Sequence, residues 1–159
     1  SGEFYFWRGH GIYLATLQPI VQATTYRPDV TLRWSAGEVE PQKLNRRQDR
    51  HFRELLIAIF DFDKEKLGRD FKQSWAVDEK GGQLALEPRN FASKRFLENI
   101  TLSGTAAIDR LSIESQSGET LRIEFTDTKE LSELAPQICV ERFLYSAETC
   151  GIHVEHDPH

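Results

Sequence analysis

The chain has 159 residues, of which 39% are hydrophobic and 28% are charged. This composition is typical of a globular domain with a real core and excludes a disordered chain. The net charge of −5 and the pI near 5.6 argue against a nucleic-acid-binding protein. No apolar run reaches the roughly 18 residues that a membrane-spanning helix needs, and no signal peptide is visible. Since Met is absent, we expect a processed or truncated chain.

The N-terminal third predicts a meander of short strands. Residues 2–8 are aromatic on both faces, which indicates a strand that is buried on one side and covered on the other. Residues 9–11 form a turn, because glycine adopts positive φ at little cost. The strands expected to follow are residues 12–16, 20–26 and 30–34.

A helix is expected after the loop at residues 35–42. Asn45 can cap its N-terminus, and apolar residues then recur at helical spacing. These apolar residues are Phe52, Leu55, Leu56, Ile59 and Phe60. The polar face carries Arg46, Arg47, Arg50 and Arg53. Residues 63–67 predict a second short helix that ends at Gly68, a residue type that favours helix C-termini.

The next part of the chain predicts another antiparallel meander. Its first strands are residues 71–75, 84–88 and 95–103. Residues 107–114 and 120–125 alternate strictly between apolar and polar side chains. Such alternation marks strands with one buried and one solvated face.

Near the C-terminus, Pro136 can open a final helix, and residues 146–159 predict a tail. Cys139 and Cys150 could form a disulfide in an oxidising compartment. The alternative is two unpaired thiols that pack as small hydrophobic groups. Spacing alone leaves both open, because it does not show the geometry that a bridge requires. Together the elements predict an α+β fold with a single domain at residues 1–145.

Few patterns point to catalysis: there is no Gly-x-Ser-x-Gly elbow, no Gly-rich phosphate loop and no His-Glu-x-x-His pair. His10 could be a loop histidine of an active site, although an exposed imidazole in a hairpin turn is the simpler interpretation. Asp61, Asp63 and Asp70 could bind a metal or act as general acids and bases. The simpler interpretation is that they are solvated charges at helix ends.

Two further groups could bind ions. His153, His156 and His159 recur every third residue, but a polar terminal tail seldom holds a metal site. The four helix arginines could contact phosphate or an anionic membrane surface. The simpler interpretation is a solvated face offset by Asp49 and Glu54.

Large apolar groups are abundant, with ten Phe, three Trp and four Tyr. An ordinary filled core would explain them. An open, curved sheet with an apolar concave face, covered by the helix as a lid, would explain them equally well. Such a face could accept an acyl chain, since each buried methylene contributes about 0.8 kcal/mol.

Several pieces of the sequence follow one another in a recognisable order. They are residues 2–8 followed by Gly11-Ile12-Tyr13, the bend Leu17-Gln18-Pro19, the turn Arg27-Pro28-Asp29, the apolar helix segment 55–60, and residues 71–125 with Trp75 and Leu84-Ala85-Leu86-Glu87-Pro88. In this order and spacing they resemble the LolA-like family, the periplasmic carriers of outer-membrane lipoproteins. The resemblance covers about residues 2–125, and residues from 126 onward match poorly.

The resemblance implies an open antiparallel β half-barrel with a helical lid over its apolar concave face. It implies a monomeric periplasmic carrier that is not an enzyme and needs no cofactor or metal. The cargo would be the acyl chains of lipoproteins or another lipid, received from an inner-membrane donor and passed to an outer-membrane acceptor. The family has an amphipathic helix and a strand before the segment matching Gly2, which fits a truncated chain here.

The resemblance also suggests site residues. The arginine that matches Arg8 ties the barrel to its lid in the family and affects cargo release, and Tyr13 matches an aromatic residue near the cavity. With them, we expect the acyl chain to be lined by Leu55, Ile59, Phe60, Phe71 and Trp75.

Two other functions compete with this one. The chain could be an envelope structural or interaction module with a filled core and no lipid ligand. It could also be a hydrolase of lipid esters that uses His10 and an Asp, although no nucleophile motif accompanies them.

Overall fold

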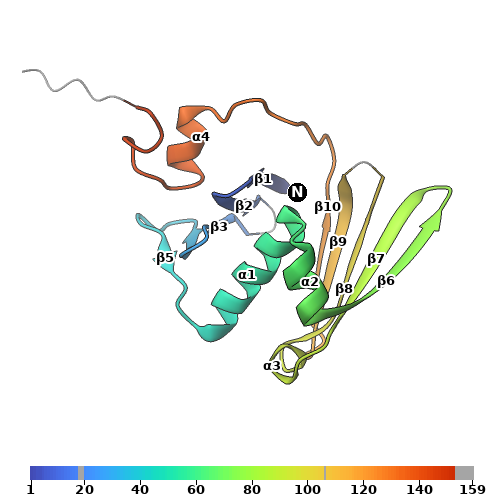
Figure 1. Ribbon diagram of the computed structural model, residues 1–159. Coiled ribbons are helices and arrows are strands. Elements are labelled where there is room, and N and C mark those ends of the chain that lie inside the picture. Colours follow the sequence, from blue (N-terminus) through green and yellow to red (C-terminus); the bar gives the residue numbers. More distant parts are fainter. Residues whose placement is uncertain (18–19, 106, 153–159) are drawn as a thin grey trace, which may run out of the picture. The chain divides into compact units, whose positions relative to one another are not determined.

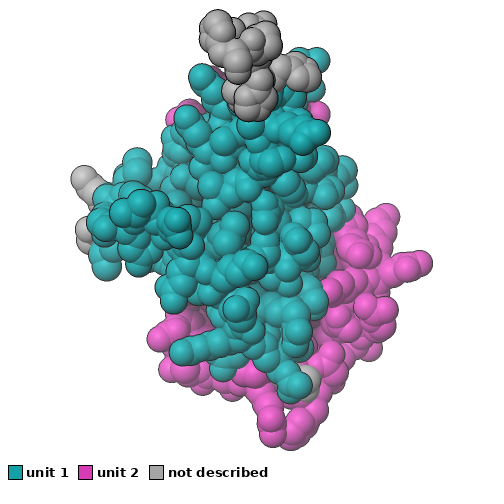
Figure 2. All heavy atoms as spheres, turned by 90° about the vertical axis from the view of Figure 1, so that its left-hand side faces the viewer, with its two compact units in different colours: residues 1–61, 131–159 teal, residues 62–130 magenta. Residues whose placement is uncertain are grey.

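The computed structural model describes residues 1–17, 20–105 and 107–152. The fold is α+β, as predicted, with two five-stranded antiparallel sheets and few helices among these residues (Figure 1). By its internal contacts the chain divides into two compact units, and the single domain at residues 1–145 stays a prediction. Unit 1 is Ser1–Asp61 with Leu131–His159, and unit 2 is Phe62–Glu130 (Figure 2). In the described part of the chain, no helix is long and apolar enough to cross a membrane.

The sheet of unit 1, called sheet A, is a meander in chain order. Its strands are β1 (Gly2–Trp7), β2 (Gly11–Thr16), β3 (Gln22–Tyr26), β4 (Thr31–Ser35) and β5 (Gln42–Lys43). The first four confirm the predicted strands. The short β5 was expected to be loop, and it pairs with β4 through Leu32↔Lys43 and Arg33↔Gln42. The predicted bend at Gln18 and Pro19 lies outside the described residues.

Helix α1 (Arg47–Asp61) packs on one face of sheet A. The ring of Phe60 lies 4.8 Å from the ring of Phe4 and 5.8 Å from that of Phe6, both on β1. At the other end of the helix, the ring of Phe52 lies 5.8 Å from that of Tyr26 on β3. The apolar positions predicted from helical spacing therefore face the sheet.

Two details of α1 differ from the prediction. The capping hydrogen bond runs from the Arg46 N–H to the carboxylate of Asp49 in the first turn, at 3.1 Å, and the predicted cap Asn45 precedes it. Arg53 does not belong to a solvated face, because it is only 8% exposed. It is three positions before Leu56 and so borders the apolar stripe.

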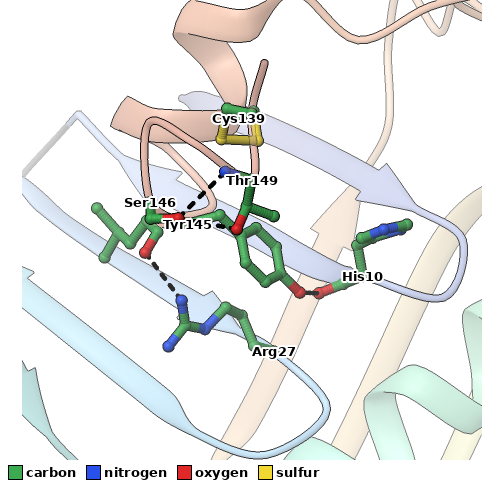
Figure 3. The surroundings of a disulfide bond; sticks show 8 residues. His10, Arg27, Cys139, Tyr145, Ser146 and Thr149 are labelled. Atoms are coloured by element: carbon green, nitrogen blue, oxygen red, sulfur yellow. Dashed lines mark hydrogen bonds between the residues drawn. A yellow bond between two sulfur atoms is a disulfide. The ribbon is translucent and has the colours of Figure 1, made fainter. Parts of the chain in front are cut away.

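The C-terminal segment covers the opposite face of sheet A. Helix α4 (Pro136–Glu141) begins at Pro136, as predicted. After the helix, Arg27 donates to the carbonyl of Leu144 at 2.8 Å, and the Tyr145 hydroxyl donates to the carbonyl of His10 at 2.7 Å (Figure 3). The Thr25 hydroxyl donates to the carbonyl of Arg142. Thr25 and Tyr26 are neighbours on β3, so they point to opposite faces, and α4 and α1 enclose sheet A between them.

The structure contains the Cys139–Cys150 disulfide that the sequence left open. The bond holds the turns after α4 to the helix itself (Figure 3). The N–H of Ile152 donates to the carbonyl of Ala147, so these turns are folded. The described part of the predicted tail is therefore part of unit 1.

Unit 2 begins with α2 (Lys64–Asp70). Asp63 caps it by accepting from the Lys66 N–H at 3.2 Å. Gly68 was predicted to end this helix, but it lies inside the helix, which continues to Asp70. The chain at Gly68 keeps ordinary helical geometry, so its C-cap tendency is not used.

The sheet of unit 2, called sheet B, is the second predicted meander. Its strands have the order β10-β9-β8-β7-β6. They are β6 (Phe71–Asp78), β7 (Gly81–Pro88), β8 (Leu97–Gly104), β9 (Ile108–Ser115) and β10 (Thr120–Glu124). Between β7 and β8 lies α3 (Phe91–Lys94), where the sequence predicted only a short connection. Asn90 caps this turn of helix by accepting from the Ser93 N–H at 2.7 Å.

Candidate ligand-binding pocket

One face of sheet B is apolar across all its strands. Directly paired residues of antiparallel strands share a face, so the registers define rows of side chains that cross the sheet. One row is Trp75, Leu84, Leu102, Leu111 and Ile123. The neighbouring row is Gln73, Leu86, Ile100, Ile113 and Leu121. Alternation therefore places nearly every large apolar group of unit 2's strands on the same side.

A hollow opens at one end of this face because the next row contains two glycines. Gly82 pairs with Gly104, and Val77 pairs with Gly82. The resulting pocket has a volume of about 330 Å³. It is lined by Phe62, Trp75, Gly82, Leu84, Leu102, Ser103, Gly104, Thr105, Ala107 and Ile108. None of these residues carries a charge, so the pocket suits an uncharged, apolar group.

The pocket combines a rigid floor with an exposed wall. Leu84 and Leu102 are buried in the sheet, and Leu84 is only 4% exposed. Trp75, the cross-strand partner of Leu84, is 60% exposed. It lies on β6, an edge strand of sheet B. The indole thus presents apolar surface to solvent beside a floor that is already packed.

Phe62 closes one side of the pocket from an unusual backbone conformation. Its φ is 53°, in the left-handed region, which is a genuine outlier for a bulky side chain. It directly follows the last residue of α1, the position where a glycine normally ends a helix. The Lys64 ammonium lies 5.9 Å from the centre of its ring. Gly would be unstrained at this position, but the residue is Phe62, whose ring lines the pocket.

The predicted ligand-binding residues fall into three places. Trp75 lines the pocket, and Phe71 is buried farther along the same face of β6. In unit 1, the predicted residues of α1 are Leu55, Ile59 and Phe60, and the first two are buried. Tyr13 lies on the opposite face of sheet A, because its neighbour Ile12 pairs with Phe6 on the α1 side. The structure thus places only Trp75 of this set in the pocket.

Tyr13 belongs to a cluster that holds the C-terminal segment. The guanidinium of Arg142 lies 5.9 Å from the centre of the Tyr13 ring and 5.5 Å from that of Tyr5. Arg142 also pairs with Glu3 at 3.3 Å. Burial raises the pKa of Tyr13, an effect that the charge of Arg142 opposes. Through Arg142, Tyr13 therefore helps to hold the C-terminal segment on sheet A.

Arg8 lies at the C-terminal end of α1. Its guanidinium donates to the carbonyl of Asp61, the last residue of the helix, at 3.3 Å. The final carbonyls of a helix have no partner within it, and the helix dipole favours a cation there. Arg8 also lies 5.7 Å from the centre of the Phe6 ring. Arg8 therefore joins the end of β1 to the end of α1. Its part in cargo release stays a prediction.

Of the residues considered for catalysis, His10, Asp63 and Asp70 have structural partners, whereas the Oδ1 atom of Asp61 is buried without a hydrogen-bond partner among the residues that the structure describes. His10 stacks on Trp7 with a centroid separation of 3.7 Å, and its Nδ1 donates to the Arg8 carbonyl at 3.1 Å. Asp63 caps α2, and Asp70 pairs with Arg69 at 3.4 Å. Within the described residues, no group of three or more His, Cys, Asp or Glu side chains could hold a metal ion.

The three C-terminal histidines, His153, His156 and His159, lie outside the described residues.

Several pocket residues were missed by the sequence reasoning. The alternation of β7 and β8 places Leu84 and Leu102 on one face, and this signal could have identified them. The hollow itself depends on Gly82 and Gly104 being paired across two strands. The positive φ of Phe62 leaves no mark in the sequence.

In comparisons with known proteins, no family model and no curated protein matches the chain.

Proposed function

We propose that this protein is a LolA-like carrier that shields an acyl chain of a lipoprotein or another lipid and performs no chemistry on it. The proposal includes the open half-barrel with a helical lid that the sequence resemblance implies. Its support from the structure is the uncharged pocket on the apolar face of sheet B. A donor and an acceptor at the two membranes remain part of the proposal.

The size and lining of the pocket suit part of a hydrocarbon chain. Its volume of about 330 Å³ lies at the lower end of the range for small-molecule sites, roughly 300–1,000 Å³. Each methylene that leaves water contributes about 0.8 kcal/mol. A segment of about six methylenes would thus contribute roughly 5 kcal/mol before the cost of ordering the chain. The exposed Trp75 would add a wall that is covered only when ligand is present.

The Cys139–Cys150 disulfide supports an oxidising compartment. Disulfides persist in the bacterial periplasm and are rare in the cytosol. A periplasmic location is therefore part of the proposal.

Displacement of an apolar fluorescent probe from the purified protein tests the proposal. We expect saturable probe binding that a lipopeptide or laurate displaces. Gly82→Leu should abolish it by filling the pocket. A Cβ at Gly82 would meet only the Gly104 carbonyl oxygen, at 3.9 Å, so the larger side chain enters open space without backbone strain.

Gln83→Leu is the matched control. It places the same side chain one position along β7, on the exposed opposite face. Equal probe binding by wild type and Gly82→Leu would remove the pocket from the proposed function.

An interaction module is the second candidate, and edge strand β6 favours it. Val77 is 83% exposed beside Trp75 on this strand. Exposed apolar edge strands pair readily with other chains. If the folded protein binds no apolar probe, but Val77→Lys abolishes an association seen by analytical ultracentrifugation, this function replaces the carrier.

A further inference from the structure

A group of polar side chains is enclosed between α1 and sheet A in unit 1. Thr24, Tyr26 and Thr31 are buried on the sheet. Thr24 pairs with Arg33 and Thr31 pairs with Tyr26, so all four point to the same face as the rings that contact α1. Arg53 reaches this face from the helix. The cluster therefore contains two guanidinium groups and three hydroxyl groups.

The two guanidinium groups lack an acidic partner. Arg53 donates to the Thr31 hydroxyl at 3.3 Å, and Arg33 donates to the Thr24 hydroxyl at 3.4 Å. Neither has a carboxylate at ion-pairing distance within the described ranges. The carboxylate of Asp49 acts on Tyr26 from nearby, but its hydrogen bond goes to the N–H of Arg46. The local charge is thus dominated by cations.

The burial of Arg53 makes this arrangement unusual. Its side chain is more than nine-tenths buried, and its Nε has no hydrogen-bond partner. A buried charge is normally paired, and an unsatisfied charged donor is strongly unfavourable. A guanidinium also presents N–H groups in a fork that matches the two oxygens of a carboxylate or phosphate. A carboxylate or phosphate group would supply the partner that Arg53 lacks.

We propose that Arg53 and Arg33 form a binding site for an oxyanion, a carboxylate or phosphate group, with the hydroxyls of Thr24, Tyr26 and Thr31 as additional donors. The Thr31 oxygen accepts from the guanidinium of Arg53, so its own proton is available to the anion. The Thr24 hydroxyl also hydrogen-bonds to Tyr26, and it would turn from Tyr26 to the anion on binding. Arg33 is partly exposed, which gives solvent access to the cluster. The site lies within unit 1 and does not depend on the pocket of unit 2.

The hydroxyl of Tyr26 is suited to donate. Burial, the largest effect, raises the pKa of Tyr26. The charge of Arg33 and the hydrogen bonds that Tyr26 makes with Thr24 and Arg33 oppose the shift. The phenol therefore stays protonated at neutral pH and does not compete as an anion.

Nuclear magnetic resonance of the arginine Nε–H groups tests the site directly. Inorganic phosphate is titrated into ¹⁵N-labelled protein and compared with chloride at equal ionic strength. We expect the Arg53 and Arg33 signals to shift saturably with phosphate, whereas the signal of exposed Arg50 on the same helix does not. Signals that respond alike to phosphate and chloride would overturn the site.

Two variants complete the test. Arg53→Met should weaken phosphate binding at least tenfold, as read from the Arg33 signal, whereas Arg50→Met should leave it unchanged. If Arg53→Met does not fold, Arg33→Met provides the same test at a less buried position. Unchanged phosphate affinity in a folded variant of either residue would show that the arginines serve only to hold α1 on the sheet.

The source of the anion is distinguished by comparing phosphate, acetate, dodecyl phosphate and laurate, with dodecanol as the neutral control. Tighter binding of the amphiphilic anions than of the free ions identifies a lipid headgroup, and equal binding identifies a free anion. Each supports the site, whereas a response to dodecanol alone contradicts it. Gly82→Leu should leave the response to inorganic phosphate intact, so failure of the carrier proposal and failure of this site are separable.

Discussion

Trp75 and Leu84 form a cross-strand pair in which one residue is exposed and the other is buried. If the pocket binds an acyl chain, Trp75→Ala should weaken binding with little loss of stability. Leu84→Ala should instead destabilise unit 2, because it leaves a cavity in a packed row. The two substitutions remove neighbouring apolar groups on the same face of sheet B, one exposed and one buried, so they separate effects on binding from effects on folding.

The magnitudes follow from exposure. A Trp side chain offers roughly 150–250 Å² of surface, and this one is 60% exposed. If ligand covers half of the exposed part, about 45–75 Å² is removed from water, which contributes about 1–2 kcal/mol. Loss of the indole should therefore weaken binding about 5- to 30-fold. Leu84→Ala should lower the free energy of unfolding by about 2–5 kcal/mol.

Probe titration and urea unfolding, both applied to each variant, measure the two effects. Because unit 1 and unit 2 need not unfold together, unfolding should be followed by probes in both units. Trp75→Ala that retains full affinity would refute the assignment of the exposed wall to ligand binding. A loss of several kcal/mol in this variant would refute the assumption that the indole contributes little to the fold.

Three further predictions concern unit 1. Arg8→Leu should fold but lower the free energy of unfolding by about 0.5–1.5 kcal/mol, since Arg8 donates to the Asp61 carbonyl at the end of α1. The substitution should also change the rate at which the probe is released. Stopped-flow kinetics equal to those of wild type would exclude Arg8 from probe release. Replacing Cys139 and Cys150 together by Ser should cost about 3 kcal/mol, because the bond joins residues separated by 11 positions; calorimetry with no decrease in the unfolding temperature would contradict this. Burial raises the pKa of Tyr26 above its usual value near 10. The stability that the protonated phenol contributes to the fold is therefore complete below about pH 10 and is lost as the pH rises through the folded-state pKa. Tyr26→Phe should flatten the alkaline fall of the free energy of unfolding in urea titrations, and an unchanged slope would contradict this prediction.

The sequence by itself determined the two meanders and the helix between them. Strict alternation in residues 107–114 and 120–125 predicted β9 and β10, and the helical spacing of Leu55, Leu56 and Ile59 predicted α1. These signals are local, because period two and period 3.6 follow from backbone geometry alone. Pro136 opened α4 for the same kind of reason, since it has no N–H to leave unpaired at a helix start.

Signals were weaker where two local preferences competed. Gly68 was expected to end α2, but the helix continued, because a glycine within a helix is only modestly unfavourable. Arg53 has the charge of a surface residue, yet its position beside the apolar stripe of α1 carries it under the helix. In both cases the surroundings outweighed the preference of the residue type.

Only the tertiary structure decided where chemistry and binding could occur. The pocket exists because the register brings Gly82 opposite Gly104 on neighbouring strands. The disulfide exists because the turns after α4 return Cys150 to within 5.7 Å of Cys139, measured between their Cα atoms. The cluster that we propose as an oxyanion site depends on α1 bringing Arg53 to Thr31. Each depends on pairing between residues that are distant in sequence or on a fold of the backbone that periodicity does not encode.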